Sequence, residues 1–363
     1  MKPQQTVIIA GAMVVIVAIA ALMRSNTPTS GGSDLPETLV PELSEALPSV
    51  RTIELTNAEG SISITSTDTG WVLPANDNYP ASTEAVVTLV NGLENLTIAE
   101  RKTANADNHA RLGLALPENA DDASPTARIR LLAEDGSPVA DVVLGNRDAN
   151  GVFVRNADEA QTWLADSAPT VSTEASAWFD TQPVQVERDE VRTVTITHAD
   201  GEVVRITKVE DSFVLAELPD GTEPIGPWQA GQVAGALGFL NVESVRSAAS
   251  LGFADTARSA VLFELEPTKV AEDGEPAADA APPTLVIEVA EIEGSPWATF
   301  TAARPGAGEV NATTEGWAYR LTAFTRDALL KRTADLTRAI EADATAGPVV
   351  PDVPAPLTPP GDD

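Results

Sequence analysis

The sequence predicts an α+β protein with mostly antiparallel sheets, in which an N-terminal transmembrane helix precedes two homologous α+β repeats. Three observations lead to this prediction. An uncharged apolar run stands near the start, the segment that begins at Val50 recurs at Val191, and both copies contain short runs of alternating apolar and polar residues. The length of 363 residues suits two domains of ordinary size.

Composition excludes several classes of function. The chain has 54 Asp and Glu against 23 Lys and Arg, and a net charge of −31 would repel a nucleic-acid backbone. Because there is no Cys, disulfides, thiol catalysis, thiolate metal sites and a lipid-modified cysteine anchor are excluded. Only His109 and His198 are present, too few for a multi-histidine metal centre. The hydrophobic content of 43% is enough for folded cores.

The apolar run Val7–Met23 is the strongest single signal. It lies between Lys2 and Arg24, and as a helix it covers roughly 26 Å, close to the ~30 Å of a bilayer core. A cleaved signal peptide is the alternative, since Ala18–Ala20 resembles a cleavage site, but the run is longer than the ~7–15 residues usual there. We therefore expect residues 1–24 to form a retained signal-anchor.

The orientation of this anchor follows from the few residues that precede it. Lys2 favours a cytoplasmic N-terminus and Arg24 opposes it, so charge alone hardly decides. A signal-anchor so close to the N-terminus would carry the body to the far side. The expectation is a single-pass protein of the bacterial inner membrane, with its C-terminal body in the periplasm.

Two further segments have the composition of unfolded chain. Residues 25–47 are rich in Ser, Thr, Pro, Gly and acids, which is typical of a flexible linker. Residues 343–363 are Pro-rich, and Pro348, Pro351 and Pro354 recur at every third position, one face of a polyproline II helix. This tail is either a ligand for a partner or a disordered end, and we favour the second interpretation.

An internal similarity divides the body into unit one, residues 48–183, and unit two, residues 184–342. VRTIELTNAEG at Val50 is identical in six of eleven positions to VRTVTITHADG at Val191. Later matches keep the same order: GWVL with SFVL, then LGL with LGF. Trp71 and Phe213 hold matching places in the second pair, so we expect them to be equivalent core residues rather than ligand-stacking ones.

Each unit should contain a hairpin, a helix and three further strands. In unit one we expect strands at 52–56, 61–66, 127–132, 139–144 and 151–155, a helix capped by Ser82, and a short helix near 174–179. In unit two we expect strands at 193–197, 203–209, 260–265, 285–290 and 298–302, a helix through Val233, Leu237 and Leu240, and a closing helix at 325–341. The acidic insertion 266–283 reads as a disordered loop.

The search for chemistry gives no catalytic, cofactor-binding or metal-ligating residues. His109 and His198 do not correspond between the units, and we expect surface or turn histidines. Gly231, Gly235 and Gly238 lie in a predicted helix without a preceding strand, so they form no dinucleotide-binding motif. The sequence also contains no nucleophile elbow, HExxH or Walker loop.

One segment resembles the start of a calcium-binding loop. Asn146, Asp148 and Asn150 alternate and are followed by Gly151, but the position of the bidentate Glu is Ala157. A tight turn between two strands explains the same residues, and we favour the turn.

The ordered motifs resemble a known family. They are the repeated V-R-x-[IV] hairpins, GWVL at 70–73, RLGL at 111–114, VVLG at 142–145, VFVR at 152–155 and WL at 163–164. Together with the anchor, this order is similar to the bacterial domain-of-unknown-function 4340 family. The resemblance brings no catalytic residues. It implies a setting beside ABC-transport permeases and an auxiliary extracytoplasmic component related to gliding motility.

We therefore expect a non-catalytic, membrane-anchored extracytoplasmic module that is accessory to an ABC-type transport or envelope complex. Its partners would be the membrane, a permease or an auxiliary envelope protein, with no cofactor. The alternative is an envelope hydrolase with unidentified carboxylates. The adjacent acids Asp121–Asp122 and Asp189–Glu190 are expected to be solvated, whereas a deep pocket with two close carboxylates of raised pKa would favour the hydrolase.

Overall fold

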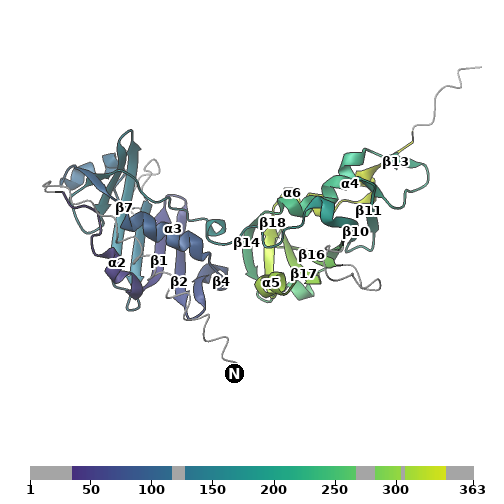
Figure 1. Cartoon of the computed structure of the whole chain (residues 1–363), viewed down its shortest axis with the longest axis horizontal. Coiled ribbons are helices and arrows are strands. Elements are labelled where there is room, and N and C mark those ends of the chain that lie inside the picture. The colour runs from purple at the N-terminus through teal and green to yellow at the C-terminus, as the bar shows by residue number, and fades with distance from the viewer. Residues whose placement is uncertain (1–34, 117–126, 267–282, 304–306, 341–363) are drawn as a thin grey trace, which may run out of the picture.

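The computed structural model describes residues 35–116, 127–266, 283–303 and 307–340, which form two lobes along the long axis (Figure 1). Every strand pair among them is antiparallel, and helices accompany both sheets. The expected class, α and β elements with mostly antiparallel sheets, is confirmed. The expected anchor, most of the acidic insertion and the Pro-rich tail lie outside the described residues. No helix within the described ranges is long and apolar enough to cross a membrane.

The first lobe is built on a nine-stranded sheet with the order β4-β3-β2-β1-β6-β7-β8-β9-β5. Its strands are β1 (Val50–Asn57), β2 (Gly60–Thr67), β3 (Gly70–Leu73), β4 (Tyr79–Pro80), β5 (Ile98–Arg101), β6 (Ala127–Ala133), β7 (Pro138–Asp148), β8 (Gly151–Asn156) and β9 (Trp163–Ala165). The short helix α2 (Leu43–Ala46) precedes the sheet, and α3 (Thr83–Glu94) lies across it (Figure 1). The expectation of a flexible linker over 25–47 is wrong for its described part, because Leu39 and Leu43 are buried in the core.

Helix α3 forms as its sequence predicts. The Ser82 hydroxyl accepts a hydrogen bond from the Ala85 amide at 3.2 Å and so satisfies one of the unpaired amides of the first turn. Val86, Leu89 and Leu93 share one face of the helix and are buried. The helix therefore covers the core of the first lobe.

The second lobe contains an eight-stranded sheet with the order β12-β11-β10-β15-β16-β17-β18-β14. Its strands are β10 (Val191–Thr197), β11 (Val203–Val209), β12 (Ser212–Leu215), β14 (Val242–Ser247), β15 (Arg258–Leu265), β16 (Thr284–Ile292), β17 (Ser295–Ala303) and β18 (Trp317–Leu321). Four helices belong to this lobe: α4 (Pro227–Ala234), α5 (Ala307–Thr314), α6 (Ala323–Leu329) and α7 (Thr333–Leu336). A separate pair of strands joins β13 (Thr222–Pro224) to β19 (Thr337–Ala339).

Eight strands have the same order in the two sheets. The order β3-β2-β1-β6-β7-β8-β9-β5 of the first sheet matches β12-β11-β10-β15-β16-β17-β18-β14 of the second. They also share irregularities. The pairing of β1 with β6 shifts register between Val50 and Thr52, and that of β10 with β15 shifts between Val191 and Thr193. A bulge is a local feature that strand order does not impose, so the likeness extends to backbone detail.

Trp71 and Phe213 occupy the same register position, since each pairs with the residue five places earlier in the preceding strand. Their burial differs. Phe213 is 1% exposed, whereas Trp71 is half-buried and packs against the core from its edge. The expectation of a core residue therefore holds in full for Phe213 and only in part for Trp71.

The expected closing helix at 325–341 is wrong. Helix α6 ends at Leu329, α7 spans only Thr333–Leu336, and β19 follows directly. Arg332 has an extended backbone, with φ −92° and ψ 163°, which interrupts the helical path. The backbone of β19 then bonds to β13 instead of continuing a helix. The helix through Val233 is also shorter than expected, because it ends at Ala234 and a 3₁₀ turn, η9 (Ala236–Phe239), follows.

Candidate functional site

The two lobes meet where the loop after β3 touches β14. This loop contains a 3₁₀ turn, η3 (Pro74–Asn76), and leads into β4. The Asn76 side-chain amide donates to the Val245 carbonyl at 3.0 Å. One carboxylate oxygen of Asp77 accepts hydrogen bonds from Arg246 Nε at 2.7 Å, the Ser247 amide at 2.9 Å and the Ser250 hydroxyl at 2.7 Å. Polar contacts from one short loop therefore hold the second lobe.

Hydrogen bonds from Arg246 and Ser250 lower the pKa of Asp77 to about 2. The loop reaches this arrangement through an unusual backbone, since Asp77 and Asn78 both have positive φ, 56° and 62°. Asp and Asn tolerate this left-handed region better than other residues with a Cβ. The residue types of the loop thus fit its geometry.

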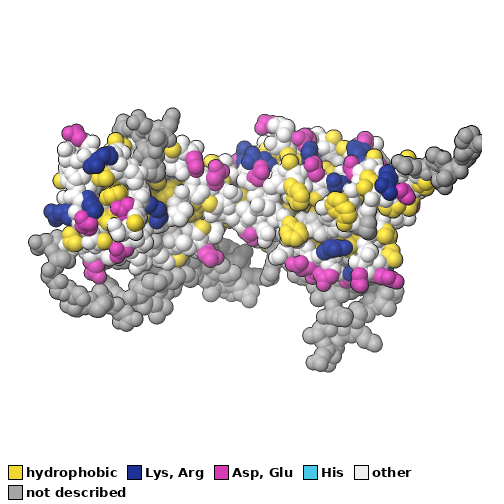
Figure 2. All heavy atoms as spheres, turned by 90° about the horizontal axis from the view of Figure 1, so that it is seen from above, with side chains coloured by type: hydrophobic (Ala, Val, Ile, Leu, Met, Phe, Trp, Pro, Cys, Tyr) yellow, Lys and Arg dark blue, Asp and Glu magenta, His cyan; other side chains and the backbone are white. Residues whose placement is uncertain are grey.

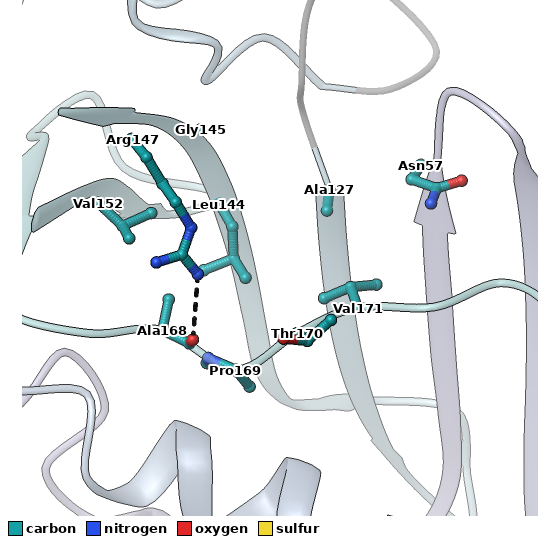
Figure 3. Close-up of a pocket in the computed structure, with 10 residues that line it drawn as sticks. All are labelled: Asn57, Ala127, Leu144, Gly145, Arg147, Val152, Ala168, Pro169, Thr170 and Val171. Atoms are coloured by element: carbon teal, nitrogen blue, oxygen red, sulfur yellow. Dashed lines mark hydrogen bonds between the residues drawn. The ribbon is translucent and has the colours of Figure 1, made fainter. Parts of the chain in front are cut away.

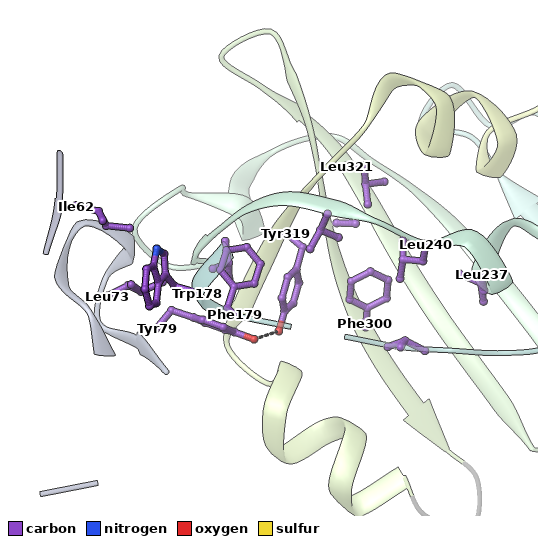
Figure 4. Packing of buried hydrophobic residues seen from close by; sticks show 14 of the residues in the cluster. Ile62, Leu73, Tyr79, Trp178, Phe179, Leu237, Leu240, Phe300, Tyr319 and Leu321 are labelled. Carbon is purple, nitrogen blue, oxygen red and sulfur yellow. Dashed lines mark hydrogen bonds between the residues drawn. The ribbon is translucent and has the colours of Figure 1, made fainter. Parts of the chain in front are cut away.

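Aromatic side chains fill the junction beside this loop (Figure 4). The Tyr79 ring packs edge-on against Trp317, Phe179 and Tyr319, with centroid distances of 4.8, 5.6 and 6.0 Å. The hydroxyls of Tyr79 and Tyr319 share a hydrogen bond of 3.1 Å, and burial raises the pKa of both phenols. A single cluster of buried residues runs through this junction from one lobe into the other.

A hollow of about 590 Å³ opens at the same junction. Polar side chains from both lobes line most of it, and they include Ser172, Glu174, Thr181, Asn241, Glu243 and Arg320. Glu243 and Arg320 form an ion pair, with 3.2 Å between Oε2 and Nε. Because its lining is mostly polar, the hollow does not suit a hydrophobic ligand. Because the Glu243 carboxylate is paired with Arg320, the hollow does not favour acid–base chemistry either.

A second hollow, of about 440 Å³, lies in the first lobe beside β7 and β8 (Figure 3). Its lining is mostly apolar and includes Leu144, Val152 and Val171. The Arg147 guanidinium reaches across it and donates to the Ala168 carbonyl at 3.5 Å. Among the residues that the structure describes, no carboxylate lines this hollow.

A third hollow, of about 560 Å³, lies between α2 and β7 and is lined by Asp141, Asp158 and Glu159 among others. Asp141 pairs with Arg128 at 2.8 Å. Burial raises the pKa of Glu94, yet this carboxylate lines none of the three hollows. Among the described residues, no group of three potential metal-ligating side chains was found.

The two histidines are apart from each other. His109 is in the first lobe, where Nε2 lies 3.0 Å from the Ala160 carbonyl oxygen. His198 follows β10 and is buried, with Nε2 3.4 Å from the Lys331 carbonyl oxygen. Both rings contact backbone carbonyls, and neither contacts the other.

The calcium-like segment is a turn between strands, as expected. Strand β7 continues to Asp148, β8 begins at Gly151, and Asp148 Oδ1 accepts from the Asn150 amide at 2.7 Å. Asn146 instead donates from its side chain to the Arg111 carbonyl at 3.1 Å.

Two other expected positions have local structural roles. Glu190 accepts a hydrogen bond from the Glu187 amide at 3.2 Å and caps a short turn. The other pair of adjacent acids, Asp121–Asp122, lies outside the described residues. Gly231 leaves room for Arg188, because a Cβ there would lie 3.0 Å from the guanidinium. Arg188 in turn lies over the Phe213 ring at 5.3 Å.

The sequence analysis missed an exposed apolar surface on the second lobe. The described residues include nine exposed large hydrophobics, all between Val203 and Ile340. Three are aromatic: Trp228 on α4 is 60% exposed, Phe239 on η9 is 79% exposed, and Phe324 on α6 is 72% exposed. Helix α6 packs against both α4 and η9, so the three lie on adjacent elements. We call Trp228, Phe239 and Phe324 the aromatic face.

Figure 2 looks onto the side of the molecule that carries α4 and α6, and it shows hydrophobic side chains gathered there on the second lobe. The sequence feature that accompanies this surface is an uncharged run, which would suit a buried helix equally well. Residues 224–242 include no charged side chain, although 21% of the chain is charged. The corresponding helix of the first lobe, α3, contains Glu84 and Glu94.

Comparison with known proteins identifies the family. No curated protein and no solved structure matched the chain. A family model described as a domain of unknown function, DUF4340, matches residues 71–260, from β3 in the first lobe to β15 in the second. Because the match covers more than half of the 363 residues, this chain belongs to the DUF4340 family.

Proposed function

We propose that the protein is a non-catalytic, membrane-anchored extracytoplasmic module that binds a membrane partner through the aromatic face. The partner class is an ABC-type transport or envelope complex, and the binding surface on that partner is apolar. In this proposal residues 7–23 anchor the chain in the inner membrane and both lobes lie in the periplasm.

The observation that carries the proposal is the exposure of Trp228, Phe239 and Phe324 on adjacent elements, the first two within a run that has no charged residue. Contiguous exposed apolar surface is uncommon on soluble proteins and marks interaction sites. Large aromatic side chains supply much of the binding energy at protein interfaces, where charged residues are depleted. A net charge of −31 opposes self-association of the chain through such a face.

The shared strand order and shared bulges support a second part of the proposal, that units 48–183 and 184–342 are copies of one ancestral unit. The copies use the loop before their helix differently. In the first lobe that loop holds β14 through Asp77, whereas in the second lobe it forms β13 and pairs with β19. The first copy would thus set the position of the second, which presents the aromatic face.

Co-purification tests the proposal. We would solubilise membranes that contain the full chain and measure recovery of ABC-type transporter subunits with the parent and with a Trp228→Ser, Phe239→Ser, Phe324→Ser variant. The expected result is at least a tenfold loss of recovery with the variant. A matched control replaces Val203, Val209 and Val214 by Ser, because these side chains are also exposed but lie on β11 and β12.

The localisation has a separate test. A reporter that is active only outside the cytoplasm, fused after Asp363, should be active, and the mature chain should retain residues 7–23. A silent reporter, or a mature N-terminus at Ala21, would contradict the anchored arrangement.

A further inference from the structure

We infer that the aromatic face has an occupant within the same chain, the Pro-rich segment 347–360. This inference rests on the proposed function, because the Pro-rich segment would compete with the proposed partner for the aromatic face. When this segment is bound, the partner must displace it. The tail would then regulate access to the docking surface.

The described chain ends at Ile340, beside the start of strand β13. Strand β19 pairs with β13, and this pairing is extended at both ends by hydrogen bonds from the Ile225 amide to the Leu336 carbonyl at 3.0 Å and from the Ile340 amide to the Gly221 carbonyl at 2.9 Å. An ion pair between Glu223 and Arg338, 2.8 Å from Oε1 to Nε, joins the same strands. Strand β13 continues into α4, which carries Trp228. The tail therefore starts beside Gly221, at the end of β13 that is farther from α4, and has to run back along β13 to reach the aromatic face.

The residues that follow Ile340 are numerous enough to reach α4. From Gly221, the neighbour of Ile340, to Trp228 the chain covers at most ~23 Å at about 3.3 Å per residue. Residues 341–347 can cover a similar distance, so Pro348 can return to α4. From there the segment to Pro360 would extend about 40 Å as a polyproline II helix, long enough to cross α4, η9 and α6.

The Pro-rich segment also suits an aromatic surface chemically. Polyproline II segments bind to surfaces lined by exposed aromatic rings, because the extended chain is already ordered and the proline rings pack on the aromatic faces. Pro348, Pro351 and Pro354 repeat at the three-residue period that places them on one side of such a helix. Val349, Val350 and Leu357 add apolar contact.

The low charge of the segment also suits contact with an apolar surface. Between residues 344 and 361 the tail contains one charged side chain, Asp352, in a protein with 54 acidic residues. Residues 224–242 contain none. A tail with many carboxylates would lose their hydration on an apolar surface, whereas this segment loses little. Two more exposed apolar side chains belong to the strand pair: Ile225, 40% exposed, just before α4, and Ile340, 56% exposed, beside Gly221.

Because the Pro-rich segment is part of the same chain, even a weak contact with the aromatic face would be substantially populated. A segment joined by a short linker experiences an effective concentration on the order of millimolar. Isolated proline-rich contacts of millimolar affinity would therefore be occupied about half of the time, and a tighter partner can still displace them. A second copy of the chain would lack this advantage at low concentration.

Hydroxyl-radical footprinting with mass spectrometry tests the inference on the full chain in detergent. We would compare the parent, a chain that ends at Ala342, and a Pro348→Ser, Pro351→Ser, Pro354→Ser variant. The expected result is an oxidation rate at Trp228, Phe239 and Phe324 that rises at least threefold in both altered chains. A Pro267→Ser, Pro276→Ser, Pro282→Ser variant is the matched control, since it loses three prolines outside segment 347–360, and it should resemble the parent.

Equal oxidation in all four chains would overturn the inference. Protection in the parent that disappears on hundredfold dilution would also overturn it, because the occupant would then be the tail of a second copy. Co-purification with the chain that ends at Ala342 separates this inference from the proposed function. If that chain still requires the aromatic face for recovery of the partner, the function stands even when the footprint shows no bound tail.

Discussion

Asp77 of the first lobe and Arg246 of the second form an ion pair, with 2.7 Å between Oδ2 and Nε. The same oxygen accepts two more hydrogen bonds from the second lobe, from the Ser247 amide and the Ser250 hydroxyl. One carboxylate therefore organises the polar part of the junction. Because the buried cluster also continues across the junction, the lobes should unfold together.

We predict that Asp77→Asn lowers the free energy of unfolding near pH 7 and flattens its dependence on acid pH. Hydrogen bonds lower the pKa of Asp77 from 3.8 to about 2. A lowered pKa stabilises the folded state above the unfolded pKa, and this stabilisation is lost as the pH falls from about 4 to about 2. Since the side chain remains partly solvated, we expect a loss of about 1 kcal/mol. Urea unfolding at several pH values measures it.

The control for Asp77 is Asp135→Asn. Its carboxylate also has a lowered pKa, because of hydrogen bonds from Ser137, but it is exposed in the turn between β6 and β7 and far from the junction. If both variants lose the same stability, the junction does not explain the effect at Asp77.

Removing the hydroxyl of Tyr79 or of Tyr319 should lower the free energy of unfolding by different amounts. Tyr79→Phe leaves the Tyr319 hydroxyl bonded to the Thr313 carbonyl at 3.2 Å, so we expect a loss of about 0.5–1.5 kcal/mol. Tyr319→Phe removes both of these bonds and leaves the buried Tyr79 hydroxyl without the Tyr319 oxygen, so the loss should be about 1–3 kcal/mol. Thermal and urea unfolding would rank the two, and the reverse order would contradict the hydrogen-bond arrangement.

The matching glycines of the LGL and LGF motifs form a second informative pair. Gly113 and Gly252 have φ of 68° and 62°, so Ala at either position should cost about 1–2 kcal/mol in backbone strain. At Gly113 the new Cβ would lie 2.6 Å from Asn146 Oδ1 and 2.9 Å from the backbone nitrogen of Asn146. At Gly252 nothing lies within 4 Å of the new Cβ. Gly113→Ala should therefore cost about 1–3 kcal/mol more, as measured by urea unfolding. Equal costs would show that the Asn146 contact relaxes freely.

The matching aromatics Phe213 and Trp71 should differ for a reason of burial. Phe213 is 1% exposed and lies under Arg188, so Phe213→Ala should cost about 3–5 kcal/mol. Trp71 packs only against the edge of the core, and Trp71→Ala should cost about half as much. Calorimetry gives both values. A larger loss at Trp71 would mean that it anchors its lobe despite its exposure.

Local signals predicted most of the strands and the first helix. The hairpin around Asn57–Gly60 and the cap at Ser82 depend on residues near in sequence, and both appear as expected. The closing helix failed because the helical periodicity of 325–341 did not reveal that β13, more than a hundred residues earlier, would pair with Thr337–Ala339.

The junction and the aromatic face could not be read from local pattern in the same way. Asp77 looks like an ordinary turn residue in the sequence, and only the fold brings Arg246 to it. Trp228, Phe239 and Phe324 look like core residues, since large aromatics usually are buried. The uncharged run 224–242 was visible, but it fits a buried helix equally well until the exposed side chains are seen.

The most direct test of the proposed docking surface is site-specific photo-crosslinking in living cells. A benzophenone amino acid would replace Phe239 or Phe324 in the full chain and in the chain that ends at Ala342, with Thr88 on the exposed side of α3 as the control position. We expect adducts with a membrane-embedded subunit of an ABC-type transporter from positions 239 and 324, stronger without the tail, and none from position 88. Adducts absent from both face positions in both chains, or equally strong from position 88, would contradict the account.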